Sequence, residues 1–531
     1  MTPELARTTA QLSREIRRPI GLLITRRGVI EQVLVGSGSI PSVESLSKFR
    51  AGIRSLRGVR LIRTQLTDEP LTQEDLTNLA LLRLDLVGVL NVDTQGEPTL
   101  LHLAHLLPPN SHGQICQLLK PMPVHHMTLQ LDAFLKALDS DLLQRDTHFT
   151  VVDGKESAVL VSANPKSRAE QEERLEELSE LATSAGVEVL DRFHQRTHED
   201  YQRFLLGRGK LKEVVIRALQ RGADLLIFDQ DLAPAQARAI SEVTDIKVID
   251  RTQLILDIFA RRAHTREGKV QVELAQLRYL LPRLSGRGTS LSRLGGGIGS
   301  RGPGETKLET DRRRIRDRIA HLERELGHIA RHQDQRRARR LRHALPIVSI
   351  VGYTNAGKST LLNALTESQV AAEDRLFETL DTTSRRLRFP EHREIIITDT
   401  VGFIRDLPKD LVGAFRTTLE ELRDADMLLH VVDATAKDID LQIDSVEAIL
   451  RTLGVDDIPR VLVLNKCDRL SAHESLVLCE RYRAISISAL RKESLRPLTA
   501  HLEAFLAKRS TGDEQRDLGA QARSPALASG R

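Results

Sequence analysis

Aromatic residues and cysteines are scarce in this sequence. It has no tryptophan, four tyrosines and twelve phenylalanines among 531 residues, so its hydrophobic cores must be built mainly from leucine, isoleucine and valine. Three cysteines (Cys116, Cys467 and Cys479) are too few for a disulfide framework in so long a chain, which indicates a reducing compartment, by default the cytosol. No stretch approaches the ~18 consecutive apolar residues of a membrane span, so we expect neither insertion nor export.

The length and the charge distribution indicate several domains and a polyanionic partner. Because a single hydrophobic core stops growing at ~250–300 residues, the chain should form three or four domains. The net charge is only +5, but residues 261–343 contain 22 lysines and arginines against nine acids, whereas the rest of the chain is acidic. This concentration of positive charge favours binding to a polyanion. A solvated helix face is the alternative that charge alone leaves open.

Residues 1–149 are expected to form an extra N-terminal α+β domain of unknown role. Their apolar spacing predicts two β-hairpins and one helix, and we assign no chemistry to them. The first hairpin pairs residues 20–25 with 29–35, the second pairs residues 84–93 with 99–106, and the helix covers residues 129–143.

Residues 150–260 alternate strand-like and helix-like segments, which predicts an α/β domain with a mainly parallel sheet. Within it, residues 207–210 (Gly-Arg-Gly-Lys) lead into a helix and could hold an anion, although a surface lysine on a glycine-started helix is the alternative. His194 and His198 are spaced to share one helix face, and we expect a structural or solvent role for them. The predicted strands are residues 158–162, 186–190, 224–229 and 247–249, and the predicted helices are residues 169–183 and 212–220.

Residues 261–343 are predicted to form a basic helical hairpin. Two apolar stripes have the spacing of a coiled-coil seam, and two such seams can bury each other as an antiparallel pair. The connecting loop, residues 285–304, holds eight glycines and three arginines (Arg287, Arg293 and Arg301) but no acid, so it can approach phosphates closely. Because aromatic residues for base stacking are few, we expect contact with folded RNA; a flexible linker is the alternative. The stripes are Val270, Leu274, Leu277, Leu281 and Leu284, and Ile315, Ile319, Leu322, Leu326 and Ile329.

The most specific signal opens the predicted domain of residues 344–507. An apolar strand, residues 347–351, runs into a complete Walker A motif and then into a helix from Thr360. In this construction backbone N–H groups at a helix N-terminus hold phosphate oxygens, Lys358 neutralises the β and γ phosphates, and the Ser359 hydroxyl ligates Mg²⁺. The motif consists of Gly352, Tyr353, Thr354, Asn355, Ala356, Gly357, Lys358 and Ser359.

Three further motifs follow apolar strands and predict a guanine nucleotide. The first motif, which begins at Asp399, supplies a carboxylate near the metal and the Gly402 amide for the γ-phosphate. In the second, Asp468 can accept hydrogen bonds from N1–H and the exocyclic amine of guanine, a donor pair that adenine lacks. The third is placed to offer backbone N–H groups to guanine O6. The assigned residues are Asp399, Thr400, Val401 and Gly402, then Asn465, Lys466, Cys467 and Asp468, then Ser488, Ala489 and Leu490.

The segment before Asp399 should sense the γ-phosphate. We choose Thr379 as the ligand of Mg²⁺ beside Ser359, while Thr382 and Thr383 stay open. Phe403 stands where many GTPases carry the glutamine that orients the attacking water, so hydrolysis should be slow without a partner, an RNA surface or a bound ion such as K⁺ at Asn355. The segment comprises Phe377, Glu378, Thr379, Leu380 and Asp381, and the predicted catalytic set is Lys358, Thr379, Gly402 and Asn355.

From about residue 155 to 505, the chain resembles the HflX GTPases of the translation-factor-related class. The resemblance rests on DRTQLILDIF at 250–259, EGKVQVELAQL at 267–277, GPGETKLETD at 302–311 and the Walker A motif. It implies an α/β fold class: a P-loop GTPase domain preceded by an α/β domain and an antiparallel coiled-coil hairpin, here with the extra α+β domain in front.

The resemblance also implies a function and partners. The expected protein binds the large ribosomal subunit and its RNA in the GTP state, inserts its glycine-rich loop toward the peptidyl-transferase region and splits stalled or idle ribosomes under stress. An adenine nucleotide, ATP, is expected at the α/β domain. Residues 508–531 are polar and should be disordered. We expect a monomer without a membrane span. The alternative is a regulatory GTPase switch that acts on a protein partner through the hairpin.

Overall fold

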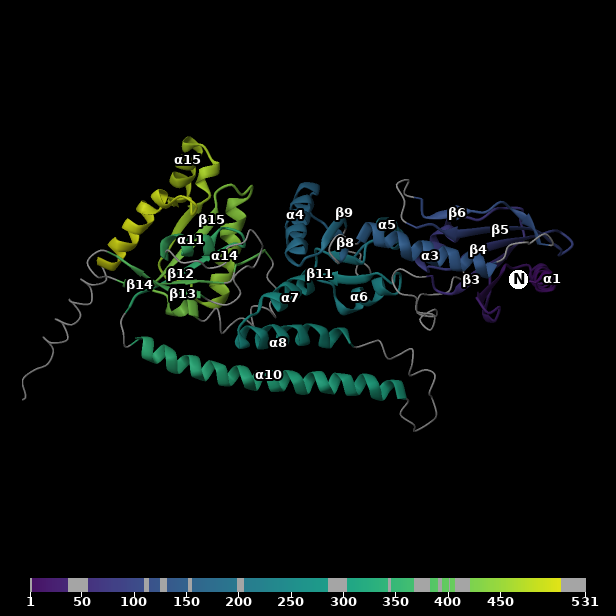
Figure 1. Cartoon of the computed structure of the whole chain (residues 1–531), viewed down its shortest axis with the longest axis horizontal. Helices are drawn as coiled ribbons and strands as arrows, with labels where there is room; N and C mark the ends of the chain where they lie inside the picture. The colour runs from purple at the N-terminus through teal and green to yellow at the C-terminus, as the bar shows by residue number, and fades with distance from the viewer. Residues whose placement is uncertain are drawn as a thin grey trace, which may run out of the picture. The chain divides into compact units, whose positions relative to one another are not determined.

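The structure is a computed structural model in which the chain divides into two compact units, Met1–Leu254 and Ile255–Arg531 (Figure 1). Among the helices that it describes, none is both long and apolar enough to cross a membrane. The described residues are 2–36, 56–108, 114–124, 131–150, 155–197, 205–284, 303–341, 345–366, 383–389, 394–400, 402–405 and 421–507.

The first unit opens with a mixed β-sheet of order β2-β1-β3-β4-β5-β6, with β7 also paired to β5. Both predicted hairpins are confirmed, because β1 pairs antiparallel with β2, and β4 with β5. The predicted helix is also present, but it begins at Leu131 and continues to Thr150. The strands are β1 (Ile20–Thr25), β2 (Ile30–Val35), β3 (Val59–Gln65), β4 (Leu86–Val92), β5 (Pro98–Leu106), β6 (Cys116–Leu118) and β7 (Met122–Pro123), and the helices are α1 (Pro3–Glu15), α2 (Gln73–Leu81) and α3 (Leu131–Thr150).

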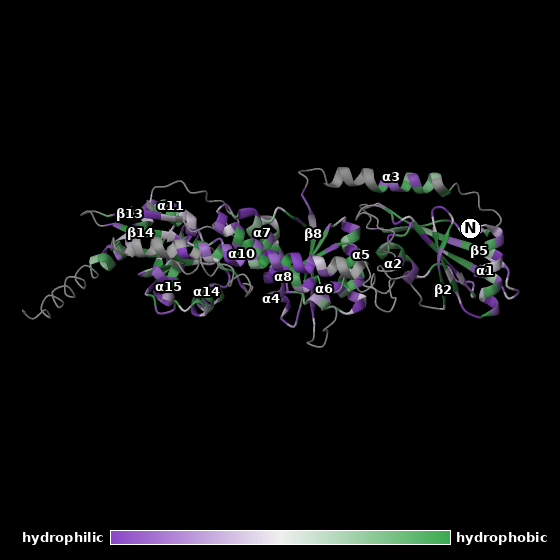
Figure 2. Ribbon diagram, turned by 90° about the horizontal axis from the view of Figure 1, so that it is seen from below, coloured by the Kyte–Doolittle hydropathy of each residue, from purple (hydrophilic) through white to green (hydrophobic). Residues whose placement is uncertain are grey.

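This sheet is buried on both faces because its strands alternate between two cores. Leu22 packs in a core with Ala6 of α1, whereas its neighbour Leu23 packs in a core with Leu79 of α2 and Leu138 of α3. Successive side chains of a strand point to opposite faces, so a run of consecutive apolar residues is required here. The strands of this sheet are accordingly coloured mainly hydrophobic in Figure 2.

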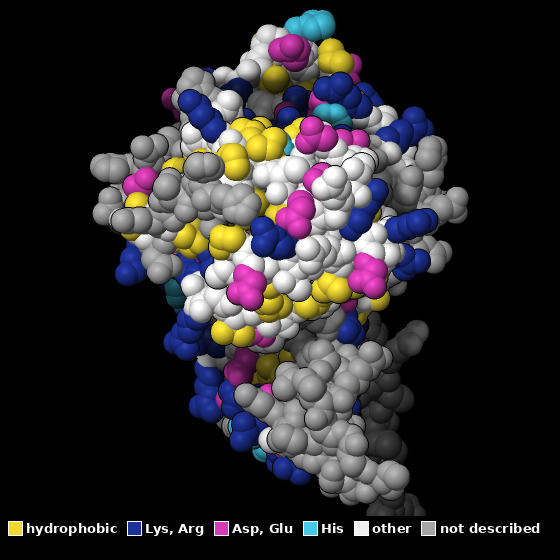
Figure 3. Space-filling view, turned by 90° about the vertical axis from the view of Figure 1, so that its right-hand side faces the viewer, with side chains coloured by type: hydrophobic (Ala, Val, Ile, Leu, Met, Phe, Trp, Pro, Cys, Tyr) yellow, Lys and Arg dark blue, Asp and Glu magenta, His cyan; other side chains and the backbone are white. Residues whose placement is uncertain are grey.

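The edge strand β2 differs from the rest of this sheet because most of its side chains are exposed. Val33 is 55% exposed, and Leu12 of α1 and Ile16, which caps the end of that helix, are exposed as well. On the face at the right-hand end of Figure 1, hydrophobic side chains are interspersed with lysine, arginine and acidic side chains (Figure 3). Such interspersed charge discourages edge-to-edge pairing of exposed strands.

The second sheet of the first unit is parallel, with the order β11-β10-β8-β9, as the sequence predicts. His194 corrects one expectation, because it lies in β9 and not on a helix, while His198 lies outside the described residues. The edge strand β9 continues through polar residues, which an edge position tolerates, so apolar spacing marked only its first half. The strands are β8 (Ser157–Asn164), β9 (Glu188–Arg196), β10 (Leu225–Phe228) and β11 (Lys247–Asp250), and the helices are α4 (Arg168–Ser184), α5 (Arg208–Arg221) and α6 (Pro234–Ser241).

The two sheets of the first unit are joined by a shared core and a buried arginine. Leu81 of α2 packs in the core of the parallel sheet, beside Leu206 and Leu211. Arg57 donates from Nε to the carbonyl oxygen of Leu82 at 2.9 Å and forms an ion pair with Asp245. The N-terminal sheet is therefore packed against the parallel-sheet region and does not form a separate compact unit.

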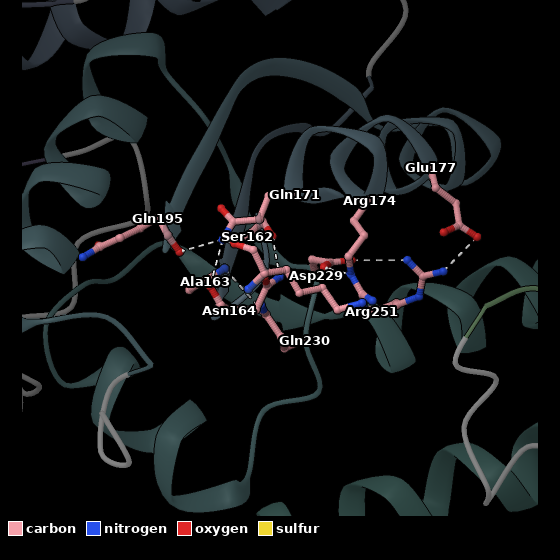
Figure 4. A network of polar contacts seen from close by, with 11 residues as sticks. Ser162, Ala163, Asn164, Gln171, Arg174, Glu177, Gln195, Asp229, Gln230 and Arg251 are labelled. Carbon is pink, nitrogen blue, oxygen red and sulfur yellow. Dashed lines mark hydrogen bonds and ion pairs between the residues drawn. The ribbon is translucent and has the colours of Figure 1, made fainter. Parts of the chain in front are cut away.

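A buried network of charges lies at the carboxyl ends of the parallel strands (Figure 4). Asp229, which follows β10, accepts a hydrogen bond from Arg174 Nε of α4 at 2.6 Å and pairs with Arg251 Nη1 at 3.3 Å. Arg251 also pairs with Glu177 of α4 at 3.0 Å. Because Arg251 is the first residue of α7 (Arg251–Arg262), the network fixes the start of that helix to α4 and β10.

The second unit contains two long helices, α8 (Arg266–Arg283) and α10 (Pro303–Leu341), which pack side by side. Val270, Leu274 and Leu322 of the predicted stripes are buried at their contact. The helices run antiparallel, since Arg266 pairs with Glu325 at 2.8 Å and Glu273 with Arg318 at 2.7 Å. The loop arginines Arg287, Arg293 and Arg301 lie outside the described residues.

The remainder of the second unit is a six-stranded sheet of order β13-β14-β12-β15-β16-β17, in which only β13 is antiparallel to its neighbour. On β15, Val431 belongs to the core covered by α11 and the helix of residues 496–507, whereas Val432 packs in the core under α14 and α15. The strands are β12 (Ile347–Gly352), β13 (Thr383–Arg388), β14 (Glu394–Asp399), β15 (Met427–Asp433), β16 (Arg460–Asn465) and β17 (Ile485–Ser486), and the helices are α11 (Lys358–Thr366), α14 (Ile439–Leu453) and α15 (Ala472–Tyr482).

Candidate functional site

The Walker A motif forms a tight loop between β12 and α11, which begins at Lys358, two residues before the predicted start. Asn355 and Gly357 have left-handed φ angles of 62° and 87°. A Cβ atom on Gly357 would lie 2.3 Å from Asn465 Nδ2, and one on Gly352 would lie 2.1 Å from the carbonyl oxygen of Val431. Only glycine fits these two positions, so the loop backbone can curl around an anion at the helix N-terminus.

Lys358 is almost completely buried inside this loop. Its Nζ donates to the carbonyl oxygen of Tyr353 at 2.9 Å. Burial lowers the pKa of Lys358 to about 8, and nearby Asp399 opposes this shift. A desolvated ammonium group of this kind interacts strongly with a phosphate that replaces its lost hydration.

The carboxyl ends of β12 and β14 bring a hydroxyl and a carboxylate together. Ser359 Oγ donates to Asp399 Oδ2 at 2.7 Å, and the Asp399 side chain is fully buried. Thr400 Oγ1 donates to the carbonyl oxygen of Ile350 at 2.7 Å, which ties the two strands together. Oxygen donors of these two types suit Mg²⁺, so the residues present fit that ion.

Gly402 is packed directly on the lysine. A Cβ atom at this position would lie 3.0 Å from Lys358 Nζ and 2.8 Å from Thr354 Cγ2. The absence of a side chain therefore lets the Gly402 backbone approach the phosphate side of the loop. The side chain of Phe403, the next residue, has no polar atom with which to orient an attacking water, and the residue is only 1% exposed.

Asn465 links the phosphate loop to the third guanine motif. Its Nδ2 donates to the carbonyl oxygen of Ala356 at 2.8 Å, and its Oδ1 accepts from the Ala489 N–H at 2.9 Å. One buried side chain thus holds the two segments that should contact the phosphates and the base.

The carboxylate of Asp468 lies near this link, three residues after Asn465. The side chain of Ser488 is the main cause of a lowered pKa at Asp468, which keeps that carboxylate ionised. Lys466 has a left-handed φ of 65°, and its Nζ pairs with Asp433 Oδ2 at 2.8 Å. Cys467 Sγ contacts the carbonyl oxygen of Leu464 at 3.3 Å, and Leu490 is 76% exposed.

The structure thus brings most of the predicted site residues together at one edge of the sheet. Two participants were missed: Asp433, which pairs with Lys466, and the hydroxyl of Tyr353. Asp433 could have been found from its place at the end of an apolar run, as Asp399 was. The predicted residues outside the described part of the chain are Phe377, Glu378, Thr379, Leu380, Asp381, Thr382 and Val401.

The suggested anion loop of the first unit has a different environment. Lys210 pairs with Glu213 at 2.8 Å and lies over the ring of Phe193, with Nζ 5.2 Å from the ring centroid. Gly207 caps α5 without a side-chain hydrogen bond. These contacts favour the alternative of a surface lysine. Among the described residues no group of three or more histidine, cysteine and acidic side chains is arranged to hold a metal.

The glycine-rich phosphate loop, the Ser359–Asp399 pair and the Asn465–Asp468 motif define a P-loop GTPase. Family models agree: residues 172–260 match "GTP-binding GTPase N-terminal", residues 262–340 match "GTP-binding GTPase Middle Region" and residues 347–466 match "50S ribosome-binding GTPase". The chain belongs to the HflX family of GTPases, and it is a GTP hydrolase with a mixed α/β P-loop fold.

Individual relatives cover much of the chain. The GTPase HflX of Caldanaerobacter subterraneus subsp. tengcongensis is 50% identical over 354 residues, which are 67% of this chain and 81% of the relative. The GTPase HflX of Escherichia coli (strain K12) is 46% identical over 326 residues, 61% of this chain and 76% of the relative. Among solved structures, a GTP-binding protein from Sulfolobus solfataricus in complex with GDP is 26% identical with a TM-score of 0.37, covering 65% of this chain and 99% of its own.

Proposed function

We propose that this GTPase binds the large ribosomal subunit in its GTP state and splits or rescues stalled and idle ribosomes under stress. The observation that carries the proposal is the antiparallel pair α8–α10, which presents exposed arginines, among them Arg313 and Arg316. The matching family model, described as a 50S ribosome-binding GTPase, supports the same partner. Arginine on a rigid helix suits the phosphates of a folded RNA.

Co-sedimentation with large ribosomal subunits tests this proposal. With a non-hydrolysable GTP analogue the protein should pellet with the subunits, and binding should weaken steeply as salt rises, because phosphate contacts release counterions. Replacing Arg287, Arg293 and Arg301 by alanine should reduce the pelleted fraction, as should the double change Arg313→Ala and Arg316→Ala. The matched control replaces the exposed Arg168 and Arg238 of the first unit by alanine. Equal binding with GDP, with the GTP analogue and without nucleotide would refute the proposal.

A regulatory switch that acts on a protein partner through the helical pair is the second candidate. The exposed Leu280 on α8 is the observation that favours it. A protein interface of this kind should depend far less on salt than RNA binding does.

We propose the following roles in the nucleotide site. Lys358 binds the β and γ phosphates, the Gly402 amide donates a hydrogen bond to the γ-phosphate, and Asp468 accepts hydrogen bonds from guanine. Ser359 and Thr379 would hold Mg²⁺, with the carboxylate of Asp399 nearby, and the ion would neutralise charge on the phosphates when bound. Asn355, which has a left-handed backbone conformation within the phosphate loop, is proposed to ligate K⁺. Hydrolysis is slow alone and stimulated by a partner, because Phe403 cannot orient water.

We also propose roles for other parts of the chain. The α/β domain of residues 150–260 is proposed to take ATP, because the order of its sheet reverses between β8 and β10, the place where open parallel sheets bind ligands. We also propose that residues 261–343 act as a coiled-coil hairpin and that the protein is a cytosolic monomer. The expectation for residues 508–531 lies outside the described part of the chain. Calorimetry with an ATP analogue, in protein already saturated with GDP, would reveal a separate adenine site or its absence.

A further inference from the structure

The phosphate loop is joined to the segment that follows Gly402 by a short backbone pairing. The Phe403 N–H donates to the carbonyl oxygen of Gly352 at 3.1 Å, and the Thr354 N–H donates to the carbonyl oxygen of Phe403 at 2.7 Å. Tyr353 and Phe403 thus form an isolated parallel β-bridge. The pairing uses both backbone groups of Phe403.

A side chain extends this pairing by two residues. The phenol oxygen of Tyr353 accepts a hydrogen bond from the backbone N–H of Arg405 at 2.7 Å. Tyr353 is only 8% exposed, so its ring is held by packing and its oxygen is fixed in place. Residues 403 and 405 are therefore both attached to the phosphate loop, one by backbone and one by the tyrosine hydroxyl.

This attachment determines where Gly402 lies. Gly402 precedes Phe403 directly, and its Cα sits so close to Lys358 that an added Cβ atom would lie 3.0 Å from Nζ. A shift of the following backbone would move the Gly402 N–H relative to the lysine that binds the γ-phosphate. Placement of an amide donor within a fraction of an ångström is what electrostatic stabilisation requires.

We propose that Tyr353 is a positioning residue for the γ-phosphate. By holding the Arg405 N–H, its hydroxyl fixes the segment after Gly402, and so keeps the Gly402 amide aimed at the γ-phosphate of GTP. Tyr353 itself need not touch the nucleotide through its side chain. The proposal rests on the roles assigned above to Gly402 and Lys358. Because GDP has no γ-phosphate, the hydroxyl should matter for GTP and not for GDP.

The test is Tyr353→Phe, which keeps the ring and removes only the hydroxyl that accepts from the Arg405 N–H. Loss of one hydrogen bond predicts that affinity for a non-hydrolysable GTP analogue falls about three- to tenfold. The turnover number should fall as well, while GDP affinity stays within about twofold. The matched control is Tyr482→Phe in the same sheet domain, which removes a hydroxyl bound to Asp440 Oδ1 at 2.8 Å on the exposed surface. The control should change neither affinity.

Two outcomes would overturn the proposal. An equal loss of affinity for GDP and for the GTP analogue would mean that the hydroxyl merely supports the folded loop, and no change in either affinity would mean that it has no role. Amide hydrogen exchange gives an independent readout: with the GTP analogue bound, the Arg405 N–H should exchange faster in Tyr353→Phe than in the unaltered protein. Failure of ribosome binding would leave these nucleotide measurements unaffected, so the two proposals fail separately.

Discussion

The hydroxyl of Ser359 donates a hydrogen bond to the carboxylate of Asp399 across 2.7 Å. The two residues come from positions 40 apart in the chain, and they meet because β12 and β14 are adjacent parallel strands whose carboxyl ends share one edge of the sheet. The same edge holds Asn465 at the end of β16. Sheet topology, rather than proximity in sequence, assembles the candidate nucleotide site.

Removing the Ser359 hydroxyl should weaken the use of Mg²⁺. In Ser359→Ala we expect the Mg²⁺ concentration for half-maximal GTP hydrolysis to rise at least about tenfold, because the proposed oxygen ligand is lost. Hydrolysis measured across a Mg²⁺ titration checks this. Ser445→Ala, which removes a hydroxyl from the exposed face of α14, is the control, and a Mg²⁺ dependence identical to that control would contradict the assignment.

Changing Asp468 should change which base is bound. Asp468→Asn replaces a double acceptor by a side chain that also donates, so affinity for GTP should fall about 100-fold or more. Xanthosine triphosphate, which has a carbonyl oxygen in place of the amine of guanine, should gain affinity in this variant. Competition binding of the two nucleotides is the measurement, and an unchanged preference for guanine would show that another group reads the base.

At alkaline pH, Lys358 should take up a proton when GTP binds. The pKa of Lys358 is lowered to about 8 by burial, so above that pH the free lysine is largely neutral. A bound triphosphate favours the charged form and raises this pKa, so GTP affinity should fall as pH rises through 8. Calorimetry at pH 8.5 in two buffers of different ionisation enthalpy should detect the uptake. At pH 6.5, where the lysine is already charged, none is expected; equal uptake at both values would contradict the prediction.

Asn465 should contribute to stability as well as to binding. Asn465→Ala leaves the Ala356 carbonyl and the Ala489 N–H without their partner inside the protein. Each unsatisfied buried group costs about 1–3 kcal/mol, so the free energy of unfolding of the nucleotide-free protein should fall by at least that amount. Denaturant unfolding followed by circular dichroism tests this, and a midpoint equal to that of Ser445→Ala would rule it out.

The stability of the folded protein should fall when Asp245, the acidic partner of Arg57, is removed. Asp245→Ala leaves the guanidinium of Arg57 buried without that partner, and we expect a destabilisation of about 1–3 kcal/mol, because Asp245 is one-third exposed. Adding Arg57→Met should recover part of the loss, since the buried charge is then removed. Thermal unfolding of the two variants is the measurement, and purely additive losses would contradict the coupling.

Local sequence patterns predicted the helices and strands of this protein better than they predicted the contacts between them. The turn and alternation signals around residues 26–28 and 95–98 were sufficient for both hairpins. His194 was placed on a helix because β9 continues through polar residues, and the exposed edge of a sheet has no apolar pattern to reveal it. The Walker A glycines were predicted from their motif. The partners of Asn465 and Tyr353 could not be predicted, because those contacts join segments 24 to 109 residues apart and depend on sheet order.

The burial of Leu81 within the parallel-sheet core bears on how the additional N-terminal region can be studied. A fragment shortened to begin near residue 155 would expose the surface beside Leu206 and Leu211 to water. It would also leave Asp245 without its ion-pair partner, Arg57. Such a fragment would be prone to self-association, so any activity it loses could reflect damage at the cut rather than a missing role. Point changes on the exposed face of β2 would probe the region while keeping that junction intact.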